Sequence, residues 1–156
     1  MRHHARIPAF LAAALTAALG LSALYAGGLF APGPNSDLIA LEKQIAAGTA
    51  DAGTWQSYGD ALRTAHRFGH AAAAYRRALE LQPDLRDARL NLGLSLGQAS
   101  NSDTAGPDAF FAFINDLMLS EPKLAVDILD RQELAPLRAD ARFAPVYQNA
   151  KAQAAD

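Results

Sequence analysis

Small and large residues alternate between residues 52 and 85 in a manner typical of two helices packed side by side. Gly59 and Ala71 are small at the points where two antiparallel helices must approach closely. The large side chains that fill the space around them are Trp55, Leu62, Tyr75 and Leu79. Pro83 ends the second helix, because proline has no backbone N–H to donate. The spacing predicts a helical hairpin.

This pattern resembles the tetratricopeptide repeat, a unit of about 34 residues with the signature W-x2-L-G-x2-Y, then A-x3-F, then P. The matching positions are Trp55, Tyr58, Gly59, Leu62, Ala71, Tyr75, Ala78 and Pro83. Tyr58 stands where leucine is usual, and Leu62 stands where tyrosine is usual. The resemblance implies a helical repeat that binds peptide segments or helices of other proteins.

The turn between the two predicted helices reads His66-Arg67-Phe68-Gly69. His66 stands where this family commonly has glycine, a position that can require a left-handed backbone. Histidine tolerates that conformation better than branched residues do. Phe68 is expected to cover the end of the hairpin.

A second, altered copy of the pattern begins at Arg86. Leu92, Gly93 and Leu96 take the places of Tyr58, Gly59 and Leu62, one repeat length further along the chain. If Pro122 ends the second helix, five extra residues lie between the helices, and the polar residues 100–106 read as an enlarged turn. We therefore expect a regular repeat over residues 52–85 and a modified repeat over residues 86–122.

The helix that follows the enlarged turn is apolar on two stripes. One stripe holds Phe110, Phe113 or Ile114, and Leu117, and the other holds Phe111 and Met118. Two stripes indicate two neighbouring elements, so we expect these side chains to pack in a core. The alternative is an exposed aromatic groove for a partner.

Both ends of the repeat region are predicted to be covered by further helices, as solenoids require. A leading helix over residues 37–51 carries Leu38, Leu41 and Ile45 at helical spacing. Residues 123–156 supply the C-terminal caps, in which Leu124, Ile128 and Leu129 face inward and Asp140 starts a last helix with Phe143, Val146 and Tyr147. Residues 134–147 are similar to a closing segment that is common after bacterial repeats of this kind.

An uncharged apolar stretch, residues 9–31, precedes these helices. At about 1.5 Å per residue, a helix of this length spans roughly the 30 Å of bilayer hydrocarbon. Arg2 and Arg6 lie in the basic segment 1–8, so the positive-inside rule predicts a cytoplasmic N-terminus and an exported domain. Residues 32–36 form a proline-containing linker. The expected location is the bacterial inner membrane, crossed once, with the domain in the periplasm.

The alternative for the same stretch is a cleaved signal peptide, with the best cleavage motif at Ala26-Gly27-Gly28. The apolar run is longer than the usual core of a signal peptide, and Tyr25 and Phe30 are typical of an interfacial end. These features favour the anchor. We thus expect an all-α fold, a solenoid of one regular and one modified tetratricopeptide repeat with capping helices, behind a single N-terminal transmembrane helix.

Composition excludes several classes of function. The chain has no cysteine, which removes disulfides, thiolate nucleophiles, cysteine zinc sites and covalent haem attachment. Its formal net charge is −2, and both charges before residue 35 are basic, so the remainder is weakly acidic and a poor candidate for binding nucleic acid. His66 and His70 are four apart, but the turn separates them, and surface histidines are favoured over a metal site.

We find no catalytic constellation and expect no enzyme activity, no metal and no cofactor. "GLSLG", residues 93–97, mimics a nucleophile elbow in letters, but it lies inside a predicted helix. Ser and Asp occur in capping and turn contexts without a histidine base nearby.

The resemblance instead implies a partner-binding surface on the concave face, built by the first helix of each repeat. The family's binding positions correspond here to Gln56, Asp60, Arg63, Thr64, Asp87, Leu90, Asn91, Leu94 and Gln98. The variety that clamps a C-terminal carboxylate needs Lys and Asn where this chain has Gln56 and Asp60, which puts that clamp in doubt. The alternative for each residue is ordinary solvated helix surface.

A narrower resemblance covers residues 38–84. A membrane span, a short leading helix and a Trp-bearing repeat occur in the same order in the repeat subunits of bacterial cytochrome c maturation and haem lyase complexes. Such a domain holds apocytochrome for haem attachment, although the family has more repeats than this chain. Two hypotheses follow: an adaptor that captures a protein partner outside the cytoplasm, and a structural accessory subunit of a larger membrane complex.

Overall fold

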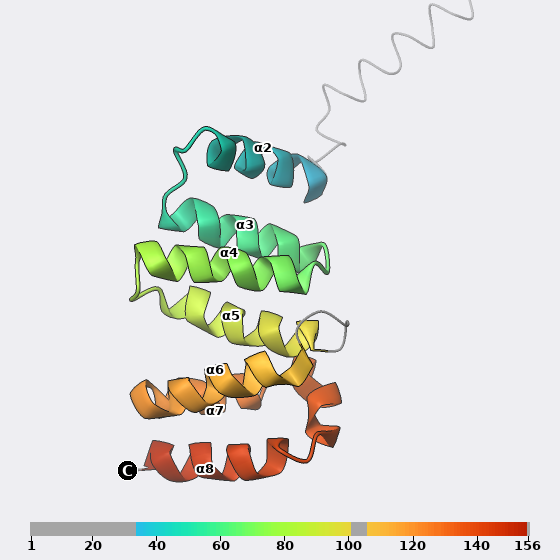
Figure 1. Ribbon diagram of the computed structural model, residues 1–156, viewed down its shortest axis with the longest axis vertical. Coiled ribbons are helices and arrows are strands. Elements are labelled where there is room, and N and C mark those ends of the chain that lie inside the picture. The colour runs from blue at the N-terminus through green and yellow to red at the C-terminus, as the bar shows by residue number, and fades with distance from the viewer. Residues whose placement is uncertain (1–33, 101–105, 156) are drawn as a thin grey trace, which may run out of the picture. The chain divides into compact units, whose positions relative to one another are not determined.

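The computed structural model describes residues 34–100 and 106–155, and every regular element in these ranges is a helix (Figure 1). The elements are α2 (Pro34–Ala46), α3 (Ala52–Thr64), α4 (Phe68–Leu81), α5 (Arg86–Ala99), α6 (Gly106–Ser120), α7 (Pro122–Leu129), the 3-10 helix η1 (Gln132–Ala139) and α8 (Phe143–Ala155). Helices that follow one another in the chain also pack on one another, α2 on α3, α3 on α4 and α4 on α5. This is the arrangement expected of a helical solenoid.

The helix ends follow from local sequence. Asp51 caps α3, because its carboxylate accepts a 2.7 Å hydrogen bond from the backbone N–H of Thr54. Gly48, with φ of +70°, lies just after the leading helix, which runs over Pro34–Ala46 and ends near this glycine as the sequence predicts. Pro122 occupies the first turn of α7, where its missing N–H costs nothing.

The close approach predicted within the first hairpin is confirmed. A Cβ built on Gly59 would lie 2.7 Å from the ring of Tyr75, so α3 and α4 meet closely at this glycine. Ala71 is completely buried beside them. His66 has φ of +57°, which confirms that the turn needs a left-handed residue.

The apolar helix α6 lies in the core. Both predicted stripes are buried: Phe110, Ile114 and Leu117 on one, Phe111 and Met118 on the other. Phe113 is half-buried and contacts the position of Gly93 on α5. Core packing is therefore confirmed over the exposed aromatic groove.

The C-terminal elements complete the core. Leu124, Ile128 and Leu129 of α7 face inward as predicted. The 3-10 helix η1 is not anticipated by the sequence pattern; it buries Leu134 and Leu137 against Gly97 of α5.

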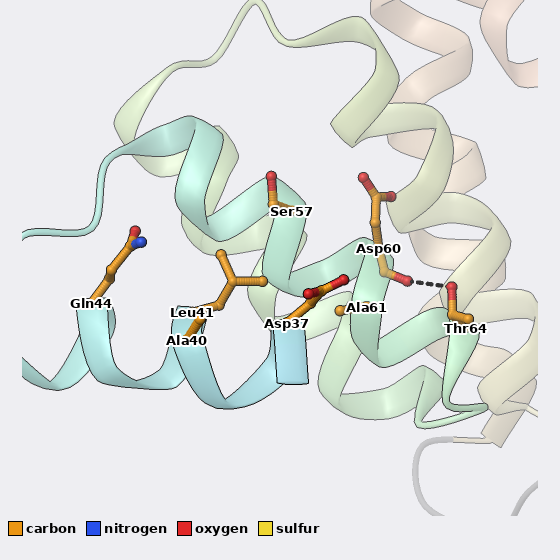
Figure 2. A pocket seen from close by; sticks show the side chains of 8 residues that line it. All are labelled: Asp37, Ala40, Leu41, Gln44, Ser57, Asp60, Ala61 and Thr64. Atoms are coloured by element: carbon orange, nitrogen blue, oxygen red, sulfur yellow. Dashed lines mark hydrogen bonds between the residues drawn. The ribbon is translucent and has the colours of Figure 1, made fainter. Parts of the chain in front are cut away.

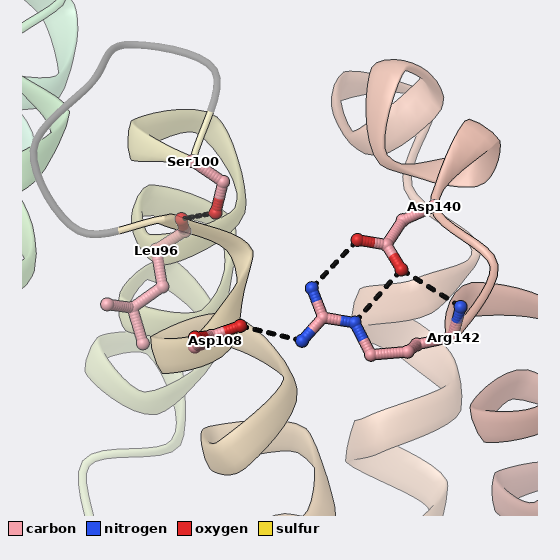
Figure 3. Close-up of polar contacts among 5 residues, drawn as sticks. All are labelled: Leu96, Ser100, Asp108, Asp140 and Arg142. Carbon is pink, nitrogen blue, oxygen red and sulfur yellow. Dashed lines mark hydrogen bonds and ion pairs between the residues drawn. The ribbon is translucent and has the colours of Figure 1, made fainter.

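Arg142, just before the last helix, forms ion pairs that connect this part of the chain to α6 (Figure 3). Its guanidinium pairs with Asp140 at 2.8 Å and with Asp108 of α6 at 2.7 Å, and it lies 4.5 Å from the ring centre of Phe111. The backbone N–H of Arg142 also donates to the Asp140 carboxylate in the turn before α8. Because α8 begins at Phe143, Asp140 does not occupy the capping position predicted for it. These hydrogen bonds from Arg142, side chain first, lower the pKa of Asp140 to about 2.

No helix within the described ranges is both long and apolar enough to cross a bilayer. The predicted span, residues 9–31, lies outside these ranges, as do residues 1–8 and the start of the linker. The enlarged turn is bounded by the end of α5 at Ala99 and the start of α6 at Gly106, and its residues 101–105 also lie outside.

Candidate partner-binding surface

Two helix faces of the same periodicity form a groove between α2 and α3 (Figure 2). Each helix contributes residues at positions i, i+3, i+4 and i+7, which share one side of a helix. The groove, which we call the α2–α3 groove, has a volume of about 540 Å³. Its lining residues are Asp37, Ala40, Leu41 and Gln44 from α2, and Ser57, Asp60, Ala61 and Thr64 from α3.

Asp60 joins this groove to the next two helices. Its Oδ1 accepts a 2.6 Å hydrogen bond from the hydroxyl of Tyr75 on α4 and a 3.2 Å hydrogen bond from the amide of Asn91 on α5. Burial, followed by the hydrogen bond to Asp60, raises the pKa of Tyr75. The carboxylate of Asp60 thus connects α3 with α5, which are the first helices of the two repeats.

A second, smaller hollow lies at the C-terminal end of α3. It has a volume of about 180 Å³ and is lined by Arg63, Thr64, His66, Phe68 and Gln98. The ring of His66 meets that of Phe68 edge-on, with 5.6 Å between centroids. Thr64 lines both hollows, so the two together form one surface that runs from α2 across α3 to the end of α5.

Polar groups of this second hollow are incompletely paired. Nε of Arg63 and Oε1 of Gln98 are buried and have no hydrogen-bond partner among the described residues. Buried polar atoms are normally paired. One donor and one acceptor beside the hollow therefore keep hydrogen-bonding capacity that no described residue uses.

The structure brings four of the nine predicted binding residues to this surface. Asp60, Arg63, Thr64 and Gln98 line the two hollows, and Asn91 is bonded to Asp60. Gln56 and Leu90 are half-buried, whereas Asp87 is exposed at the start of α5. Neither Gln56, Leu90 nor Asp87 lines either hollow.

Leu94 lies in the core, with 3% of its surface exposed. The reason is that α5 has neighbours on several sides, namely α4, α6, α7 and η1. Its residues 92–97 are all buried as a result. Leu94 therefore does not belong to the binding surface, where the family's pattern would place it.

Sequence reasoning missed the contribution of α2. The sequence pattern gives the leading helix only the role of covering the end of the solenoid, with Leu41 as one of its apolar positions. The matched spacing of residues 37, 40, 41 and 44 with residues 57, 60, 61 and 64 is the signal that could have revealed the groove. This signal can be interpreted only when the face of α2 that packs on α3 is known.

Comparison with known proteins agrees with the repeat pattern. Residues 52–95 match the family model of the tetratricopeptide repeat. The matched region holds α3, α4 and most of α5. The comparison with curated proteins and the comparison with solved structures each found no match. The match supports a tetratricopeptide repeat here, and such repeats generally mediate binding to other proteins or peptides.

Proposed function

We propose that this protein is a non-enzymatic adaptor or scaffold that binds a segment of another protein on the surface formed by α2, α3 and the end of α5. The observation that carries the proposal is the continuity of the two hollows through Thr64. Residues at the family's binding positions line both, Asp60 in one and Arg63 and Gln98 in the other. A surface of this kind suits an extended or helical segment laid across the first helices.

We further propose that this adaptor is attached to a membrane. Residues 9–31 anchor it in the bacterial inner membrane and residues 36–156 lie in the periplasm. The support is the length of the uncharged stretch and the basic residues before it. The order of span, leading helix and Trp-bearing repeat further supports a role in cytochrome c maturation, with an apocytochrome as the partner.

A second candidate is a structural accessory subunit of a larger inner-membrane complex. It is favoured by large apolar side chains that are exposed away from the two hollows. Leu119 of α6 is 83% exposed and Ile39 of α2 is 66% exposed. A permanent neighbour would cover such residues.

Site-specific crosslinking in native membranes separates these roles. A photoreactive p-benzoylphenylalanine replaces Ser57, which is exposed inside the α2–α3 groove, or Arg76, which is exposed on α4 outside both hollows. The adaptor predicts one set of proteins linked from position 57 and absent from position 76. A third variant carries the probe at Leu119.

The identity of the linked proteins then decides between the candidates. Apocytochromes or a haem lyase at position 57 support maturation. Stoichiometric links from position 119 to other membrane proteins, with none from position 57, support the accessory subunit and contradict the adaptor. Protease added from the periplasmic side tests topology: digestion of residues 36–156 only after the cytoplasm is opened would overturn the proposed orientation.

A further inference from the structure

The charged side chains that line the α2–α3 groove are both acidic. They are Asp37, in the first turn of α2, and Asp60, in the middle of α3. Figure 2 shows the side chain of Asp37 directed from α2 toward α3, beside Ala61. The nearby cation Arg63 lines the other hollow instead.

Neither carboxylate is fully used within the fold. Both hydrogen bonds that Asp60 accepts through its side chain go to Oδ1, and its Oδ2 accepts none from the described residues. Asp37 accepts a 3.4 Å contact from its neighbour Ser36 and is exposed. Two carboxylates at one groove therefore keep the capacity to bind a cation.

The remainder of the lining suits an aliphatic chain. Ala40, Leu41 and Ala61 supply an apolar stretch between the acidic positions. Lysine and arginine have long aliphatic stems that pack on apolar surface while the charged head reaches a polar partner. An apolar or acidic segment placed here would instead desolvate the carboxylates without compensation or repel them.

We infer that the α2–α3 groove binds a partner segment carrying a lysine or arginine, with its stem on Ala40, Leu41 and Ala61 and its charged head at Asp37 and Asp60. The inference rests on the proposed function, to which it adds the chemical class of the partner. Charge complementarity selects a basic segment as the occupant, since both charged residues that line the groove are acidic.

The probe is a set of short synthetic fluorescent peptides, acetylated and amidated at their ends. Each sequence is made in three forms that differ at two central positions: lysine, its neutral isostere norleucine, and glutamate. Binding to the full chain in nonionic detergent is measured by fluorescence anisotropy. We expect lysine forms to bind most tightly and glutamate forms not to bind, with the lysine preference shrinking as the salt concentration is raised about tenfold above a low-salt buffer.

Variants of Asp37 locate the effect, because the hydrogen bond that its side chain accepts within the described ranges comes from its neighbour Ser36 and joins no two helices. Asp37→Asn is expected to weaken binding of the lysine forms about 2- to 5-fold, as for a partly exposed ion pair, and Asp37→Lys about tenfold or more. Asp116→Asn on α6 makes the same change of charge at an exposed site far along the chain. It should leave affinity unchanged. Circular dichroism checks that the total helix content is the same in each variant.

Three outcomes overturn the inference while leaving the proposed function intact. They are equal affinity of the three peptide forms, a lysine preference unaffected by Asp37→Lys, and a concentration-dependent dimer in sedimentation that Asp37→Lys dissolves. The last would assign the groove to a second copy. If no peptide binds and the probe at position 57 links no protein in membranes, the proposed function itself fails.

Discussion

The ring of Tyr75 closes the space over Gly59, so that a Cβ added to the glycine would lie 2.7 Å from Cε1 of the tyrosine. Tyr75 is completely buried, and its hydroxyl is held by Asp60. The ring therefore has no open space into which it can retreat. This contact sets how closely the two helices of the first repeat approach.

Gly59→Ala should destabilise the protein, because the added methyl group overlaps a ring that cannot move freely. We expect the free energy of unfolding to fall by about 1–3 kcal/mol, the usual range for overpacking, despite the better helix propensity of alanine. Urea unfolding followed by circular dichroism measures this. Gly53→Ala is the matched control on the same helix, since its Cβ meets only Asp51 at 3.6 Å. A loss of stability in the control equal to that at Gly59 would contradict the packing explanation.

Tyr75→Phe should lower the free energy of unfolding by about 1–3 kcal/mol, because it removes a hydrogen bond to a carboxylate. Tyr58→Phe, which removes a longer and exposed bond to Glu42, should cost less. Urea unfolding of both variants measures the two losses. An equal loss in the two would mean that burial of the Tyr75 hydroxyl adds nothing to its bond.

The same tyrosine predicts an alkaline effect. Burial and the hydrogen bond to Asp60 raise the pKa of Tyr75 in the folded chain, so the unfolded chain loses its proton first. Stability should therefore fall as pH rises above about 10, the ordinary pKa of tyrosine. Urea titrations across this alkaline range should show a shallower fall in Tyr75→Phe than in the unaltered protein. If the free energy of unfolding fell equally with pH in the two proteins, Tyr75 would not be the source of the alkaline effect.

Arg142→Gln should loosen the last helix, since it removes the contacts to Asp140, Asp108 and the ring of Phe111. The melting temperature at pH 7 should drop. Hydrogen bonds from Arg142 lower the pKa of Asp140 to about 2, so their contribution is present above about pH 4 and is lost as pH falls toward 2.

The difference in melting temperature between Arg142→Gln and the unaltered protein should therefore shrink as pH falls from neutral toward the pKa of Asp140. Arg77→Gln breaks an exposed ion pair with Glu80 within α4. This control should leave the melting temperature unchanged both at neutral pH and at low pH. A constant difference across this range would mean that Arg142 acts through packing alone.

His66→Gly should stabilise the hairpin by about 0.5–1 kcal/mol, because glycine adopts the φ of +57° without a steric penalty. His70→Gly provides the opposite control: it lies inside α4, where glycine costs about 1 kcal/mol. Thermal unfolding of both variants measures the two effects. Destabilisation by His66→Gly would show that the edge-on contact between His66 and Phe68 outweighs the backbone strain.

The first hairpin could be predicted from sequence because its determinants are local. Gly59, Ala71 and Pro83 each act on a neighbour within one repeat, and the left-handed turn at His66 follows from the same register. The burial of α6 was predictable for a similar reason, since two apolar stripes on one helix indicate two packing partners.

The remaining features depend on long-range packing. Leu94 occupies a binding position of the family, yet it is buried because α5 has neighbours on several sides. The helix η1 contains Pro136 and buries only Leu134 and Leu137, a spacing too short to reveal its type. The α2–α3 groove depends on how the leading helix packs, and the bond between Asp60 and Asn91 joins residues 31 positions apart.

The contacts of Asp60 restrict which substitutions the chain can accept at this position. Its carboxylate receives donors from Tyr75 and Asn91 while also lining the groove. Exchange of this residue for an apolar one would leave two donors, the buried hydroxyl of Tyr75 and the partly buried amide of Asn91, without their acceptor. Related chains with another residue at this position are therefore expected to differ at positions 75 and 91 too, so that a change of partner preference would arrive as a set of three substitutions.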